Sequence, residues 1–303
     1  MQIAIMIEGQ EDINWTRWKR IVRAVEDFGF QGLFRSDHFT NPSPLNQDAL
    51  ELWISLAWLA DNTSRIEFGP LVSPVSFRDP MLTARQAAAV DDLAGGRLVL
   101  GLGAGWMVRE HEMFGYDLLD LGPRFDRFEE ALEVITRLLN SNDPVSFEGE
   151  YYHLRDAILL PRPQRPGGPP ILIGGTGRNR TLPFVARYAR EWNAVSTNLD
   201  EFRELNPYLD ELLRAQGRDP KSVKRSMMTS VYFGRTETEL RRHLEPEGLS
   251  PDALNPKKHF FGTPDRIREQ LAAWEAAELE RVMLRWRLVD DIDGLEALAK
   301  ALL

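Results

Sequence analysis

Residues 32–39 read GLFRSDHF, a short apolar run that turns polar within a few positions. The run follows a segment, residues 15–28, whose apolar residues recur with helical spacing. A carboxylate and an imidazole, Asp37 and His38, come directly after it. In α/β barrels the catalytic groups lie at the carboxyl ends of buried strands. We therefore expect a barrel strand here, with chemistry at its carboxyl end.

The same alternation continues along the chain. Strand-like apolar runs lie at residues 3–7, 32–34, 66–72, 98–102, 171–173, 192–196, 227–233 and 281–284, with helical spacing at 50–59, 81–93, 125–139 and 267–274. Mostly apolar strands without alternation are typical of a parallel sheet covered on both faces. The pattern predicts an α/β fold, a single (β/α)8 TIM barrel over residues 1–303, with a doubly wound open sheet as the structural alternative.

Three longer segments interrupt this alternation. Residues 105–123 follow the fourth strand and are too long for an ordinary connection to a helix. Residues 144–170 have the pattern of a small hairpin and a proline-rich linker before the fifth strand. Residues 245–261 contain three prolines and precede the eighth strand. We expect these insertions to serve as lids or subunit contacts.

Composition excludes several classes of function. The 303 residues include no cysteine, so disulfides, thiolate nucleophiles and cysteine-based metal sites are excluded. A net charge of -9 argues against a nucleic-acid partner. No apolar stretch approaches the roughly 20 residues that span a bilayer, and the first residues lack the basic region of a signal peptide. We expect a soluble, cytoplasmic protein that acts on a small molecule.

Two glycine clusters follow predicted strands. Residues 98–106 read LVLGLGAGW, with Trp106 where a dinucleotide fingerprint needs its third glycine, so nicotinamide binding is not favoured. Tight packing in the barrel explains Gly101 by itself. Residues 173–179, IGGTGRN, open a helix and have the pattern either of an anion site built from backbone N–H groups or of a plain tight turn.

Two further motifs bear on the shape of the barrel mouth and on metal binding. Prolines at positions 70 and 74 predict a bulge or strained peptide at the barrel mouth. In Glu110-His111-Glu112, the His111-Glu112 pair matches the start of a zinc-helix pattern, but Gly115 stands where the second histidine is needed. We therefore predict no metal site.

Six segments together resemble one family. They are SDHF (36–39), GPLVSPVSFRDP (69–80), GGRLVLGLGAGW (95–106), RFDRFEEALEVI (124–135), PPILIGGTG (169–177) and FGTPDRI (261–267). In this order they resemble the bacterial luciferase-like flavin and deazaflavin oxidoreductases over nearly the whole chain. The chain is most similar to the members that use the deazaflavin coenzyme F-420, in which an Asp-His pair follows the second strand.

The resemblance implies a homodimeric barrel with the cofactor ring in its mouth. It implies a bulge with a non-prolyl cis peptide around Pro70 and Leu71, behind the ring. The other implied cofactor contacts are Ala104 and Gly105 along the ring, and Gly174, Gly175, Thr176 and Gly177 at the cofactor phosphate. Asp37 and His38 would face the reactive edge of the ring.

The chemistry that follows is hydride transfer coupled to one proton. His38 would accept a proton from an alcohol substrate or donate one in the reducing direction. Asp37 would hold the imidazole in one tautomer or bond the polar edge of the ring. An FMN-dependent monooxygenase is the first alternative, and an open basic groove lined by Arg178 and Arg180 would favour the longer deazaflavin tail over FMN. A non-catalytic flavin-binding protein is the second alternative, and the retained Asp-His pair argues against it.

One departure from the family bears on the substrate. Its sugar-phosphate dehydrogenases carry a glutamate where this chain has Trp106, so glucose 6-phosphate is not the substrate that we expect. An apolar, aromatic-walled substrate pocket is predicted instead. Its candidate walls are Phe39, Phe77, Trp106, Trp192 and Trp286.

Overall fold

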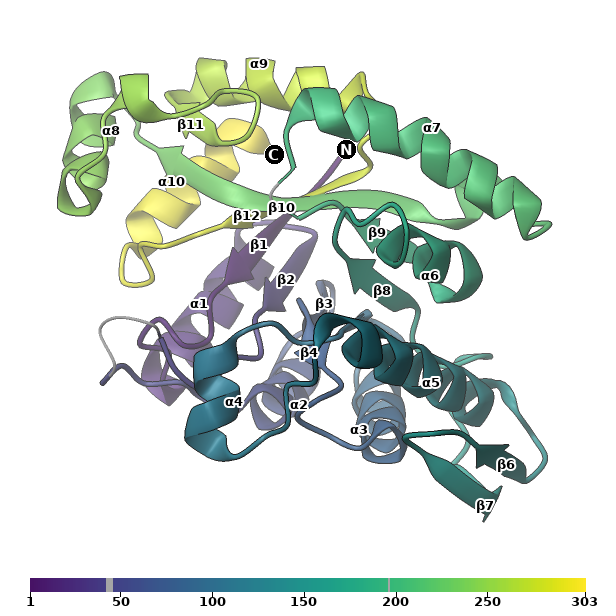
Figure 1. Ribbon diagram of the computed structural model, residues 1–303. Helices are drawn as coiled ribbons and strands as arrows, with labels where there is room; N and C mark the ends of the chain where they lie inside the picture. Colours follow the sequence, from purple (N-terminus) through teal and green to yellow (C-terminus); the bar gives the residue numbers. More distant parts are fainter. Residues whose placement is uncertain (42–45, 196) are drawn as a thin grey trace.

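The computed structural model describes residues 1–41, 46–195 and 197–303, and within them the chain forms a closed barrel of parallel strands surrounded by helices (Figure 1). The barrel strands are β1 (Gln2–Ile7), β2 (Gly32–Arg35), β3 (Glu67–Pro70), β5 (Leu100–Gly103), β8 (Ile171–Gly174), β9 (Glu191–Asn193), β10 (Lys224–Phe233) and β12 (Arg281–Arg285). Their order is β3-β2-β1-β12-β10-β9-β8-β5, and a bridge between Phe68 and Leu98 closes the ring. The predicted (β/α)8 barrel is confirmed, and the open sheet is excluded.

Two short strands extend this barrel. β4 (Ser73–Pro74) pairs with β5, and β11 (Phe260–Gly262) pairs with β10. The eight predicted apolar runs coincide with the barrel strands to within a few residues, except that Ser196, predicted as the end of one strand, lies outside the described residues. The sequence pattern therefore located every barrel strand.

The helices that surround the barrel are α1 (Trp15–Asp27), α2 (Leu52–Asn62), α3 (Pro80–Leu93), α4 (Val108–Phe114), α5 (Leu121–Asn140), α6 (Thr181–Tyr188), α7 (Leu199–Ala215), α8 (Glu237–Leu244), α9 (Pro264–Glu275) and α10 (Ile292–Leu302). The five segments with predicted helical bounds agree with α1, α2, α3, α5 and α9 to within a few residues. None of the helices in the described part of the chain is both long and apolar enough to cross a bilayer.

Side chains of the strands fill two separate layers. A small apolar cluster occupies the barrel interior: Ala4, Met6, Phe34, Leu71, Val99, Leu172 and Met283. A much larger cluster lies between the strands and the helices. Because both faces of each strand are buried, the strands read as continuous apolar runs.

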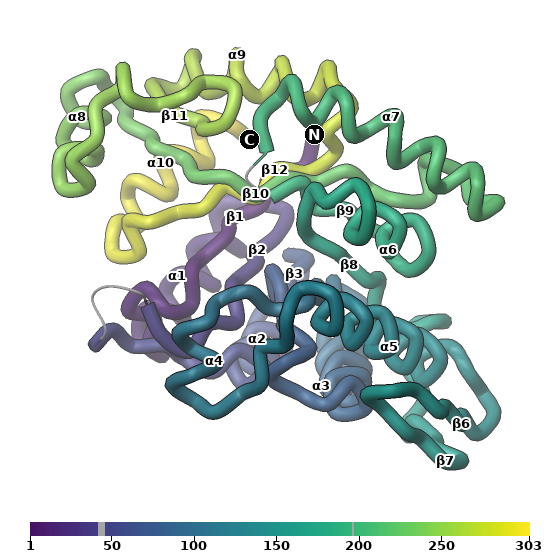
Figure 2. The backbone as a smooth tube through the Cα atoms, viewed as in Figure 1, coloured from purple at the N-terminus to yellow at the C-terminus, as the bar shows by residue number. Residues whose placement is uncertain are grey.

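Each predicted insertion has structure of its own. Residues 105–123 contain α4, a helix where the sequence predicted only a long loop. Residues 144–170 contain the expected hairpin, β6 (Val145–Glu148) and β7 (His153–Ala157), which lies beside α5 at the edge of the molecule (Figure 2). Residues 245–261 contain the 3-10 turns Glu245–Glu247 and Pro251–Ala253 and lead into β11.

Two glycines let β3 and β5 approach backbone to backbone. A Cβ on Gly101 would overlap the carbonyl oxygen of Pro70, and one on Gly69 would overlap that of Val99. The tight-packing interpretation of Gly101 is therefore confirmed. The predicted non-prolyl cis peptide is present in this region, between Leu71 and Val72.

Candidate active site

His38 lies at the carboxyl end of β2 and is held by a carboxylate from α4. Its Nδ1 atom is 2.8 Å from Glu110 Oε1, and the second carboxylate oxygen accepts the Phe39 N–H at 3.0 Å. Glu110 is 1% exposed and His38 is 14% exposed, measured on their side chains. Because the carboxylate can only accept at neutral pH, Nδ1 carries the proton and Nε2 is left as the reactive nitrogen.

The pKa of His38 reflects two opposing influences. Burial by itself would lower this pKa, since it disfavours the charged imidazolium. The hydrogen bond and charge of Glu110, with smaller contributions from Glu8 and Asp37, raise the pKa above its ordinary value. The pKa of His38 is therefore raised, so the imidazolium persists to higher pH than that of an ordinary histidine.

Asp37 lies next to His38 in sequence but its carboxylate points elsewhere. It accepts a hydrogen bond from Ser73 Oγ at 2.8 Å and forms an ion pair with Arg78, which also reaches Glu51 at 2.9 Å. The expectation that Asp37 holds the imidazole is wrong, because Glu110 occupies that position. Asp37 instead ties the end of β2 to β4 and to the residues that follow it.

Sequence reasoning missed Glu110 because it tested this residue only as part of a zinc motif. Met107, Glu110 and His111 are the buried residues of this segment, and they recur at helical spacing. That spacing, in a stretch read as loop, is the signal that could have identified an inward-facing polar pair.

A second histidine fixes α4 in place. His111 Nδ1 donates to the Met107 carbonyl at 2.7 Å, and its Nε2 accepts from Ser76 Oγ at 2.8 Å. Gly105 lies against this pair with φ +86°, and a Cβ there would be 2.8 Å from Ser76 Oγ. His111 thus connects α4 to the residues after β4, and this connection sets the position of Glu110.

Three of the five aromatic residues predicted for the substrate pocket lie near His38. Trp106 is 65% exposed and meets the His38 ring edge to face, with 5.5 Å between ring centroids. Phe39 packs on Phe77 at 4.4 Å, and Phe77 itself is buried. Trp106 and Phe39 therefore form the open rim, and Phe77 supports it from below.

Two predicted pocket residues do not lie at the mouth. Trp192 is fully buried on the outer face of β9, where it stacks on Phe202 of α7 at 5.6 Å and donates to the Gly175 carbonyl. Trp286 is buried in the same outer layer and donates to the Leu288 carbonyl. Both predictions were wrong, because these side chains belong to the core between strands and helices.

The glycine loop after β8 opens α6 as predicted. Gly175 has φ +125°, and its N–H already donates to the Asn193 carbonyl at 2.9 Å, so this amide is not free for an anion. The amides of Thr176 and Gly177 donate to no group in the described part of the chain. A Cβ on Gly177 would lie 3.0 Å from the hydroxyl of Thr181. The loop therefore keeps two adjacent backbone donors for an anion.

Two arginines lie beside this loop on the surface. Arg178 is 3.5 Å from Glu204, and Arg180 is 3.6 Å from Asp126. Exposed ion pairs of this length contribute little free energy, so both guanidinium groups remain available to an anionic ligand.

Comparison with known proteins agrees with this geometry. The family model for luciferase-like monooxygenases matches residues 1–287. An F-420-dependent glucose-6-phosphate dehydrogenase of Amycolatopsis mediterranei (strain U-32) is 30% identical over 294 residues, which cover 92% of this chain and 81% of that protein. An F-420-dependent hydroxymycolic acid dehydrogenase of Mycobacterium tuberculosis is 27% identical over 94% of this chain and 76% of its own length.

A solved structure agrees over the full length. An F-420-dependent secondary alcohol dehydrogenase, in complex with an F-420–acetone adduct, superposes with a TM-score of 0.86 at 18% identity. The superposition covers 100% of this chain and 99% of that chain, so the two share a fold. With the family model matched over most of its length, this chain belongs to the luciferase-like monooxygenase family.

Proposed function

We propose that this protein is an F-420-dependent oxidoreductase that transfers a hydride between the deazaflavin and a small organic substrate, an alcohol or ketone or an activated alkene. The observation that carries the proposal is the 2.8 Å contact between His38 Nδ1 and Glu110 at the carboxyl end of a barrel strand. Relatives named as F-420-dependent dehydrogenases, at 27% and 30% identity, support the choice of cofactor.

The residues at the barrel mouth fit such a cofactor. Thr176 and Gly177 offer free backbone donors to its phosphate, with Gly174 and Gly175 shaping the turn. Pro70, Leu71, Ala104 and Gly105 lie at or just after the carboxyl ends of β3 and β5, where the ring would lie. When bound, the deazaflavin accepts or gives the hydride.

His38 manages the proton in this reaction. In alcohol oxidation the neutral imidazole accepts the hydroxyl proton at Nε2, while Nδ1–H stays bonded to Glu110. The carboxylate of Glu110 stabilises the imidazolium that results, because an opposite charge nearby favours the protonated form. In the reducing direction the same imidazolium donates its proton. Asp37 acts as a positioning residue through Ser73 and Arg78.

The rim favours an apolar substrate. Trp106 contacts the His38 ring and Phe39 follows His38 in the chain, and Trp106 is the more exposed of the two. An aromatic rim binds alkyl or aryl groups by burying apolar surface and offers no charge to a sugar phosphate. We therefore propose a secondary alcohol or its ketone as the substrate, with Phe77 supporting the rim from below.

We also propose that the protein works as a homodimer in the cytoplasm. Ile54 of α2 and Met81, Leu82 and Leu93 of α3 are exposed apolar side chains on adjacent helices. A patch of this kind is suited to a two-fold interface with a second copy. The cytoplasm is proposed because a diffusible hydride carrier must meet the other enzymes that recycle it.

The test is an anaerobic assay that follows the absorbance of oxidised F-420 with a panel of secondary alcohols. The proposal predicts loss of absorbance with apolar alcohols and a much slower reaction with glucose 6-phosphate. Oxygen consumption with reduced FMN, and no reaction with F-420, would contradict it and favour the monooxygenase alternative.

A further inference from the structure

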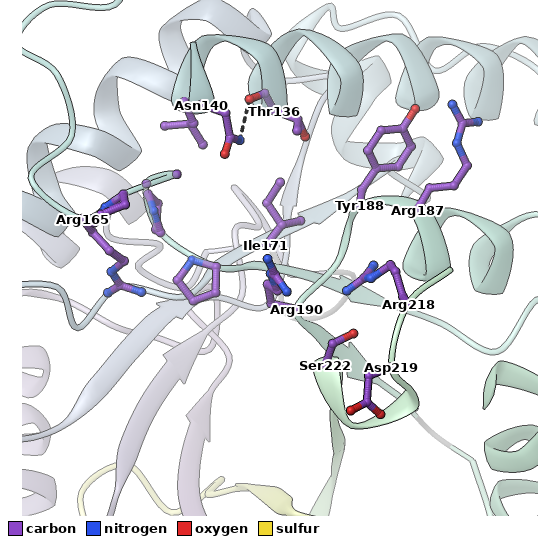
Figure 3. A pocket seen from close by; sticks show the side chains of 16 residues that line it. Thr136, Asn140, Arg165, Ile171, Arg187, Tyr188, Arg190, Arg218, Asp219 and Ser222 are labelled. Atoms are coloured by element: carbon purple, nitrogen blue, oxygen red, sulfur yellow. Dashed lines mark hydrogen bonds between the residues drawn. The ribbon is translucent and has the colours of Figure 1, made fainter. Parts of the chain in front are cut away.

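A recess of about 630 Å³ lies at the amino-terminal end of the barrel, away from His38 (Figure 3). Its walls include Ile171 at the start of β8, Arg190 just before β9, and Ser222 just before β10. His38 and the glycine loop instead follow the strands. Since all barrel strands are parallel, the recess and the proposed active site lie at opposite ends of the barrel.

The recess is lined with positive charge in a chain of net charge -9. Four arginines, Arg165, Arg187, Arg190 and Arg218, contribute to its walls. Among the described residues that line it, Asp219 is the sole carboxylate. The walls of the recess are therefore positively charged although the chain as a whole is negative, and a positive recess attracts anions.

Two of these arginines are neutralised by carboxylates. Arg165 is 2.8 Å from the buried carboxylate of Asp91, and Arg187 forms an ion pair with Glu129. Their side chains are therefore occupied, and their charges add little to the field in the recess.

The other two arginines keep uncompensated charges. Within the described part of the chain, Arg218 donates to three carbonyl oxygens at the end of α6, at 3.4 Å from Val185, 2.8 Å from Ala186 and 2.7 Å from Ala189, and pairs with no carboxylate. Arg190 is exposed, and its guanidinium has no hydrogen bond or ion pair within the described part of the chain. Figure 3 shows the Arg218 guanidinium directed toward Arg190. Burial lowers the pKa of Arg218, and the charge of Arg190 lowers it further. Two like charges facing one another favour an anion between them.

We propose that this recess binds the phosphate group of a small soluble phosphate ester, with Arg190 and Arg218 as its cationic ligands. Guanidinium groups match the oxygens of phosphate with paired, charge-assisted hydrogen bonds. The size of the recess suits a small molecule. Because it lies at the other end of the barrel, this site is separate from the proposed cofactor and substrate sites.

The test is isothermal titration calorimetry of the full chain without F-420, using inorganic phosphate and pyrophosphate as probes. Sodium chloride at matched ionic strength corrects for screening, and citrate distinguishes a polycarboxylate from a phosphate. The proposal predicts saturable binding of both phosphate probes. Arg190→Gln should weaken this binding by roughly 10- to 100-fold, since a hydrogen bond to a charged group is lost.

The matched control is Arg23→Gln, which removes an exposed charge from α1 and should leave phosphate affinity unchanged. Arg190→Gln breaks no bond to a described residue, so both variants should fold, and circular dichroism verifies this. The proposal is overturned by binding no stronger than that of chloride, by equal affinity in the two variants, or by binding of citrate alone. None of these results depends on the redox function.

Discussion

At the scale of single residues, the proposed function depends on which nitrogen of His38 exchanges a proton with the substrate. Glu110 binds Nδ1 at 2.8 Å and leaves Nε2 for the substrate. Trp106 covers one side of the ring at 5.5 Å. A histidine held in one tautomer and open at one nitrogen is suited to general acid–base catalysis.

Replacing His38 should remove the proton transfer and leave binding intact. We expect His38→Gln to lower kcat by about 10²–10⁴-fold, the usual contribution of a positioned general base, with little change in F-420 affinity. Steady-state kinetics and a fluorescence titration measure the two quantities. His153→Gln, on the exposed β6–β7 hairpin, is the control and should behave as wild type. Full activity in His38→Gln would show that a group other than His38 transfers the proton.

Replacing Glu110 should move the pH profile. Alcohol oxidation needs neutral His38, so the rate should rise with pH through a midpoint above the ordinary histidine value of 6.5. In Glu110→Gln the raising influence of the carboxylate is lost and burial remains, so the pKa of His38 falls and the midpoint moves to lower pH.

The control for this shift is Glu112→Gln, an exposed carboxylate on the same helix. We expect its kcat/KM profile to overlay that of wild type. An unmoved midpoint in Glu110→Gln would show that Glu110 does not govern the titration of His38.

The residues of the site were predictable to different degrees. His38 follows its strand directly, so local sequence sufficed to find it. Glu110 is 72 positions further along the chain, and its approach to His38 depends on tertiary packing. Sequence reasoning gives Asp37 the role that Glu110 has, because it assumes that the carboxylate next to His38 in sequence is also the one that contacts its ring. The Asp37 carboxylate is instead held by Ser73 and Arg78, a pairing that depends on tertiary packing in the same way.

At the scale of elements, α4 is the piece that completes the site. This helix has seven residues and carries both Glu110 and His111 on its buried side. The helical spacing of Met107, Glu110 and His111 covers little more than one turn and includes two polar residues, so the sequence predicted a long loop. The hydrogen bond between His111 and Ser76 holds it against the residues that follow β4.

The contact between β3 and β5 should tolerate no side chain at Gly101. A methyl group there would overlap the Pro70 carbonyl, so Gly101→Ala should lower the free energy of unfolding by roughly 1–3 kcal/mol or more. Gly122→Ala is the control, because a Cβ in this part of α5 meets nothing closer than 4.0 Å and alanine favours a helix. Urea denaturation measures the free energy of unfolding of both variants. Equal unfolding midpoints for Gly101→Ala and Gly122→Ala would contradict the close packing of β3 against β5.

At the scale of the whole molecule, the fold was predictable because its signal is repeated. Eight apolar runs and the helices between them agree on one architecture, and an error in any single element would not have changed it. The same pattern could not place Trp192 and Trp286 correctly. Strands that are apolar on both faces do not reveal which face a given side chain occupies. Both lie in the outer core.

The proposed dimer predicts a concentration-dependent mass. Leu82→Glu places a charge on the exposed apolar face of α3 and should convert a dimer into monomers, because burying an unpaired carboxylate is costly. Leu160→Glu, at an exposed position before β8, is the control. Sedimentation velocity measures both variants, and a monomeric wild type would refute the dimer.

The most direct test of the proposed activity is a fluorescence-quenching titration of the purified protein with F-420 and, separately, with FMN. The glycine loop, with Arg178 and Arg180 beside it for the longer deazaflavin tail, predicts F-420 binding at micromolar concentration or tighter, with much weaker binding of FMN. A preference for FMN, or binding of neither cofactor, would contradict the proposed function.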